Sequence, residues 1–144
     1  MEHLHSVIDY DKRFCIDPVT RMVKNNSGKV TLAQHDHNSE RFTFEIPHAD
    51  GHDMSSCDRV EIHFINKSNP SSALRSEGVY LVDDVKVSPE DNETITFSWL
   101  ISDEATKYAG SLKFLVRFIC LNGEKIAYSW STAIFKEITV VAGM

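Results

Sequence analysis

Apolar side chains that recur at every second position constrain this chain more than any other feature. The clearest stretch is Ser111–Cys120, which reads SLKFLVRFIC and has an apolar residue at each even-numbered position. This period places alternate side chains on opposite faces of a strand, whereas a helix needs a period near 3.6. The following Leu121–Glu124 contains Asn-Gly, a strong hairpin signal because both residues tolerate positive φ. We therefore predict a hairpin in which Lys125–Thr132 returns beside the first strand.

Other stretches share this period. They are Arg41–Ile46, Arg59–Asn66 and Ile134–Val141, with the shorter or less regular Phe14–Ile16, Lys29–Leu32, Val79–Val87 and Thr94–Leu100. Loops rich in Asn, Ser, Gly and Pro separate them, and strands at intervals of roughly 10 to 20 residues are typical of a sandwich. The sequence predicts an all-β chain folded as an antiparallel β-sandwich, Ig-like or jelly-roll-like.

One segment departs from the strand pattern. Residues 102–109 begin with Ser102 and two acids and are followed by Gly110, which are helix start and stop signals. We predict one short helix there. A length of 144 residues fits one domain, so we expect an N-terminal arm over residues 1–12 and a single β-sandwich domain over residues 13–141.

Charge and cysteine usage exclude several classes of protein. The net charge is −6 and no block of Lys or Arg occurs, so we expect no direct nucleic-acid binding. Three distant cysteines, Cys15, Cys57 and Cys120, do not form a disulfide framework and suit a reducing compartment. The first residues lack an apolar leader, and no long apolar run follows, so we expect synthesis in the cytoplasm without export or membrane insertion.

Histidines provide the main argument for a metal site. In an extended segment His35 and His37 would face the same way, and His48 and His52 lie in a later loop rich in Asp. Imidazole and carboxylate groups are suitable zinc ligands. The alternative is that these residues form solvated loops, because neither cluster has thiolate partners or the spacing of a helical zinc motif. We name the four histidines as candidate metal ligands and expect no metal or other cofactor.

The chain shows no sign of catalytic machinery. Its six glycines never form a phosphate-binding loop, and no nucleophile elbow occurs. We therefore expect a protein that is not an enzyme and that binds other proteins, through edge strands or through the long polar loops His48–Ser56 and Lys67–Ser76. The candidate partner-binding residues are His48, Asp50, His52, Asp53, Asn69 and Arg75.

Several motifs together resemble a known family. They are Asp36–Pro47 (DHNSERFTFEIP), Glu61–Asn66 (EIHFIN), Trp99–Ser102 (WLIS), Thr106–Gly110 (TKYAG) and Tyr128–Ile134 (YSWSTAI). In this order they resemble the N-terminal domain of baseplate upper proteins from phages and prophages of Gram-positive bacteria. The resemblance spans roughly residues 10 to 140. It implies a β-sandwich that anchors to the tail or baseplate core.

The resemblance implies a virion protein, a baseplate or tail accessory subunit, whose partners are other phage tail subunits and further copies of itself, for example in a trimer. The family continues into a trimerising stem, a function that we do not carry over to this chain. Two alternatives stay open. One is a phage-encoded inhibitor of a bacterial defence system that binds a host protein, and the other is a metal-dependent hydrolase.

Overall fold

The computed structural model describes residues 12–25, 29–47, 57, 59–68, 74–90 and 94–143. These residues are organised in strands, without a helix among them, so the predicted all-β class is confirmed. The strands are β1 (Arg13–Ile16), β2 (Val23–Asn25), β3 (Val30–Ala33), β4 (Arg41–Ile46), β5 (Arg59–Ser68), β6 (Arg75–Leu81), β7 (Lys86–Val87), β8 (Ile95–Leu100), β9 (Gly110–Asn122), β10 (Lys125–Ser131) and β11 (Phe135–Val141).

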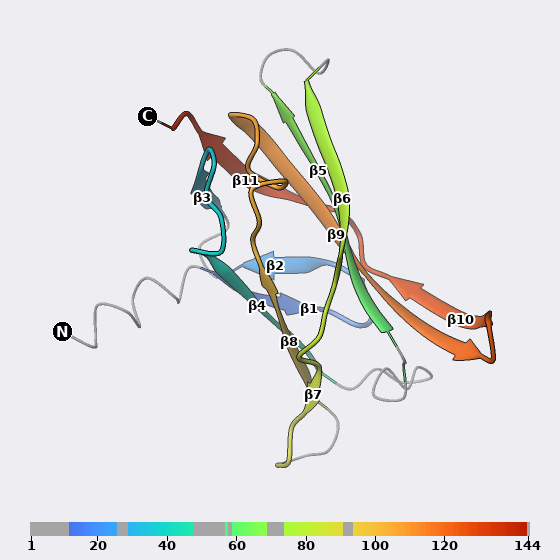
Figure 1. The fold of residues 1–144 in the computed structure, drawn as a ribbon. Helices are drawn as coiled ribbons and strands as arrows, with labels where there is room; N and C mark the ends of the chain where they lie inside the picture. Colours follow the sequence, from blue (N-terminus) through green and yellow to red (C-terminus); the bar gives the residue numbers. More distant parts are fainter. Residues whose placement is uncertain are drawn as a thin grey trace.

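The strands form two sheets that are arranged like a sandwich (Figure 1). The five-stranded sheet has the order β2-β1-β4-β8-β7, and the six-stranded sheet has the order β3-β11-β9-β5-β6 with β10 also paired to β9. Most neighbours are antiparallel, but β1 runs parallel to β4 and β11 runs parallel to β3. The predicted sandwich arrangement is present, but the prediction of antiparallel pairing was wrong for these two pairs of strands. Parallel neighbours need a long crossover, and here the intervening chain passes through the other sheet.

The core lies between the inward faces of both sheets. The alternation of side chains along each strand supplies these inward faces. In β4 exposed and buried residues alternate strictly, and Phe42, Phe44 and Ile46 are fully buried. Phe114 of β9 lies at the centre of this core and is 1% exposed. Its ring centroid lies 5.4–6.4 Å from those of Phe14, Phe42, Phe44, Trp99 and Phe135. Aromatic side chains from both sheets thus pack around one residue.

The predicted hairpin is confirmed, with its turn one residue later than the Asn-Gly signal suggested. Asn122 pairs with Lys125, so the central residues of the turn are Gly123 and Glu124. Gly123 has a φ of 67°, a conformation that glycine adopts at little cost. The tip of this hairpin is exposed and extends past the neighbouring strands (Figure 1).

The predicted strand Val79–Val87 is instead divided between the two sheets. β6 ends at Leu81, and β7 pairs with β8 on the other side of the sandwich. Two contacts hold the crossing: the Val82 N–H donates to the Val60 carbonyl, and Asp84 accepts hydrogen bonds from the Ser98 backbone N–H and hydroxyl. The alternation of exposed and partly buried side chains continues where the chain passes from one sheet to the other. The pattern of the sequence therefore cannot show where a strand of one sheet ends and a strand of the other begins.

The predicted short helix over residues 102–109 is not present. Two overlapping four-residue turns occur instead, in which the backbone N–H groups of Ala105 and Thr106 donate hydrogen bonds to the carbonyls of Ser102 and Asp103. The next backbone groups bond to other parts of the chain, since Asn66 of β5 contacts both the N–H and the carbonyl of Tyr108. Tertiary hydrogen bonds have replaced those that a helix would make.

Gly78 of β6 allows close packing against the core. A Cβ atom at this position would lie 2.6 Å from Cζ of Phe64, whose ring packs 5.5 Å from that of Trp99. We expect Gly78→Ala to lower the free energy of unfolding by about 1–3 kcal/mol, because the Phe64 ring must move. Urea denaturation measures this loss, and Ser76→Ala on the same strand is the control. Equal stability of the two variants would contradict the prediction.

Candidate functional site

The residues predicted to form a site fall into two groups. His48, Asp50, His52, Asp53 and Asn69 lie outside the described residues, so their partner-binding role and any metal site that includes them stay predictions. Arg75 is the first residue of β6, and its guanidinium lies 3.8 Å from the Glu77 carboxylate. Arg75 therefore belongs to a strand and not to the loop in which the sequence placed it.

His35 and His37 lie in a turn, which corrects the extended conformation assumed for them. His35 has a φ of 73° and Asn38 one of 58°. The His35 backbone N–H donates to the Thr106 carbonyl, and His37 Nδ1 accepts from the Asp103 backbone N–H at 3.1 Å. Hydrogen bonds of both residues thus connect this turn to the segment 102–109. Within the described part of the chain, no group of three or more His, Cys, Asp or Glu residues could hold a metal ion.

The three cysteines differ in their exposure. Cys15 is exposed on the outer side of the five-stranded sheet, whereas Cys57 and Cys120 are partly buried. Partial burial raises the pKa of the Cys15 thiol, and the carboxylates of Glu45 and Asp17 add to this effect. Backbone N–H groups of Thr20 and Val19 lower the pKa of the Asp17 carboxyl. A thiol with a raised pKa is a poor nucleophile, so the chemistry of Cys15 does not suit covalent catalysis.

The outer face of the six-stranded sheet is the surface with the most distinctive composition. We use the term outer face for the side chains of β5, β6 and β9 that alternate away from the core. Strand register places these side chains in rows across the three strands. Read from β6 through β5 to β9, successive rows are Glu77, Ile65 and Lys113; Val79, His63 and Leu115; and Leu81, Glu61 and Arg117.

An apolar stripe crosses this outer face. It consists of Ile65, Val79, Leu81 and Leu115 with Ile134, which precedes β11, and three of the five are at least half exposed: Val79 (50%), Leu81 (60%) and Ile134 (53%). All but Leu81 line a groove of about 400 Å³, together with His63, Glu77 and Lys113. A contiguous exposed apolar patch with polar neighbours is typical of a surface that another molecule covers.

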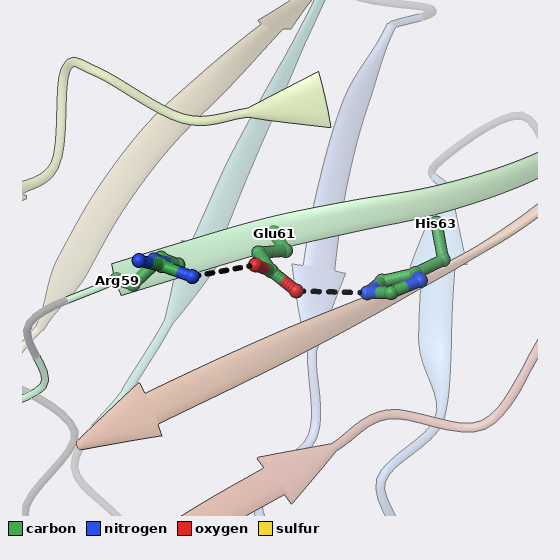
Figure 2. A network of polar contacts seen from close by, with 3 residues as sticks. All are labelled: Arg59, Glu61 and His63. Carbon is green, nitrogen blue, oxygen red and sulfur yellow. Dashed lines mark hydrogen bonds and ion pairs between the residues drawn. The ribbon is translucent and has the colours of Figure 1, made fainter. Parts of the chain in front are cut away.

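A row of polar residues on β5 reaches the groove at His63 (Figure 2). The Glu61 carboxylate lies between the other two side chains, with Oε1 3.0 Å from His63 Nε2 and Oε2 3.4 Å from Arg59 Nη1. Glu61 is 9% exposed, so its charge would be costly without these partners. A carboxylate–imidazole pair can move a proton, but the third member here is a guanidinium, which has no acceptor. The row therefore fixes the orientation of His63 at the groove.

Basic side chains flank the stripe on both sides. On β5, β6 and β9 the outer face carries five basic residues and two acidic ones, a net charge of +3 in a chain whose total is −6. The acidic residues are Glu61 and Glu77, and the basic residues are Arg59, Lys67, Arg75, Lys113 and Arg117.

The outer side of the five-stranded sheet provides a contrast. It is basic as well, with Arg13, Lys24 and Arg41, but it presents Thr43 and Thr96 where the other sheet presents the stripe. The walls of its depression of about 240 Å³ combine polar residues, among them Thr43, Glu45 and Thr96, with Phe14 and Phe44. The apolar stripe, and not positive charge alone, distinguishes the outer face of the six-stranded sheet.

These sheets and their connections define a two-sheet β-domain of a kind found in a phage protein. Among solved structures, the chain resembles the N-terminal domain of phage TP901-1 ORF48, with a TM-score of 0.51 and 17% sequence identity. The match covers 90% of this chain and 96% of that domain. At this identity the likeness shows a shared fold. A scan against models of protein families found no match, and neither did a search of curated proteins.

No helix long and apolar enough to cross a bilayer occurs in the described ranges.

Proposed function

We propose that this protein is a structural subunit of a phage virion, in a baseplate or tail, and that it acts by binding other protein subunits and not by catalysis. The observation that carries the proposal is the fold shared with the N-terminal domain of a phage protein over nearly the full length of both. The sequence motifs described above resemble phage baseplate upper proteins, and this supports the same conclusion independently.

The exposed apolar stripe supports a binding role. Burial of apolar area drives the association of proteins, and a patch of this kind with charged neighbours has the composition of a protein interface. The polar row that reaches the groove at His63 pairs Glu61 with a histidine and an arginine, which suits a fixed surface better than proton transfer. Association with further copies of the chain, as in a trimer, belongs to the same proposal, because homo-oligomers with closed rotational symmetry are common among assembled proteins.

Analysis of purified phage particles tests the proposal. We expect quantitative mass spectrometry of particles purified through a density gradient to find this chain at a fixed copy number relative to the major tail protein. Presence in infected cells together with absence from particles would overturn the proposal. If the chain then co-purified from these cells with one host protein in fixed ratio, the defence-inhibitor alternative would replace it.

A further inference from the structure

We infer that the outer face of the six-stranded sheet docks another protein whose contact surface has an apolar centre and an acidic rim. This inference rests on the proposed function and names the chemistry of the partner. It concerns the apolar stripe and the basic residues that flank it, and it excludes the five-stranded sheet.

The first step of the argument concerns the stripe itself. Ile65 and Leu115 point away from the core, although their strands already supply the core through Phe64 and Phe114. Val79 is 50% exposed and Leu81 is 60% exposed, and both lie on β6, the edge strand of its sheet. Covering such side chains is favourable by roughly 25 cal/mol for each Å² removed from water. The stripe therefore gains most from a partner with apolar groups at its centre.

The second step excludes a second copy bound face to face. If two copies bound each other through their outer faces, each face would bring a net charge of +3 to the interface. Lys113 and Arg117 would lie close to the stripe in both copies. Juxtaposed like charges oppose association and suppress the wrong partner. The two carboxylates of this face are already engaged within each copy, because Glu61 is shared between Arg59 and His63 and Glu77 lies 3.8 Å from Arg75.

The third step identifies the charge of the partner. Lys113 lies at the groove, and Arg117 lies four residues further along β9 on the same face. Carboxylates placed around an apolar centre would pair with these cations at the rim, where ion pairs mainly set specificity and the rate of association. Apolar contact and charge complementarity thus select the same partner surface.

Site-specific photo-crosslinking in the virion tests this inference. Val79 on the stripe, or Thr43 on the opposite outer side as the control, is replaced by the photoreactive p-benzoylphenylalanine, and purified particles are irradiated. We expect position 79 to crosslink to a different protein, at a peptide with net negative charge, and position 43 to give no such product.

Charge reversal provides the second measurement. Lys113→Glu with Arg117→Glu changes the outer face from +3 to −1, because each reversal changes the charge by two. Arg13→Glu with Lys24→Glu makes the same change on the five-stranded sheet. We expect the first pair to reduce incorporation into particles about tenfold or more and the second to leave it within about twofold. Thermal unfolding of both purified variants establishes that they fold.

The outcomes separate the inference from the proposed function. If the chain is in particles but crosslinks only from position 43, or if position 79 crosslinks to a second copy or to a peptide without net negative charge, the inference is overturned and the proposed function stands. Equal loss of incorporation in both charge variants overturns the inference as well. Absence of the unmodified chain from particles overturns both.

Discussion

Replacing Phe114 by alanine is expected to lower the free energy of unfolding by about 3–5 kcal/mol, the range for removing a buried aromatic side chain from a packed core. The physical reason is its position, because rings from both sheets pack around it at centroid distances of 5.4–6.4 Å. A loss of this size is a large part of the stability of a typical domain. Chemical denaturation followed by tryptophan fluorescence measures it.

Two further variants make the result interpretable. Lys113→Ala changes the adjacent residue on the outer face of the same strand and is expected to cost less than about 0.5 kcal/mol. Phe114→Leu retains much of the apolar volume and should lose less than Phe114→Ala, so that a value is obtained even if the alanine variant does not fold. A loss below about 1 kcal/mol for Phe114→Ala would show that Phe114 is not the centre of the core.

The second large effect is expected at Asn66, a fully buried polar residue of β5. Its amide group donates to the carbonyls of Tyr108 and Ser111, at 3.0 and 2.9 Å, and accepts from the Tyr108 N–H at 2.8 Å. Asn66→Ala leaves these three backbone groups without their partner, and each buried group left unpaired costs about 1–3 kcal/mol. We therefore expect a loss of about 3 kcal/mol or more.

Asn66→Leu separates hydrogen bonding from packing. Leucine has a similar size but cannot make these bonds, so a loss like that of the alanine variant is expected, together with faster hydrogen exchange at the Tyr108 amide. Ser39→Ala, at an exposed position, is the control. If Asn66→Leu were as stable as the unmodified protein, the amide would have no structural role.

Local patterns predicted most of the strands in which one face alone meets the core. β4 matches its predicted bounds, and β1, β8 and β11 begin within one residue of theirs. β2 was missed, because three residues between loops are too few for a period to be recognised. The helix expected at 102–109 and the parallel neighbours of β1 and β11 depend on contacts between distant segments, which no local pattern contains.

The candidate site was missed for a related reason. The sequence directed attention to loops rich in His and Asp, and most of these lie outside the described residues. A signal for the outer face was present: Ile65 and Leu115 are apolar residues at the polar positions of otherwise regular strands. A strand that is apolar on both faces indicates that both faces are covered. Only the register of β5, β6 and β9 shows that these residues form one surface.

The pairing of β3 with β11 has a consequence for synthesis on the ribosome. Val30–Ala33 is made early, but its neighbour in the sheet is Phe135–Val141, which is more than a hundred residues later in the chain. Until that last strand has left the ribosome, β3 has no neighbour in its sheet. Contacts between such distant segments also slow folding. The nascent chain therefore exposes an unpaired strand until Phe135–Val141 has emerged, and a translational pause before that point would prolong this exposure.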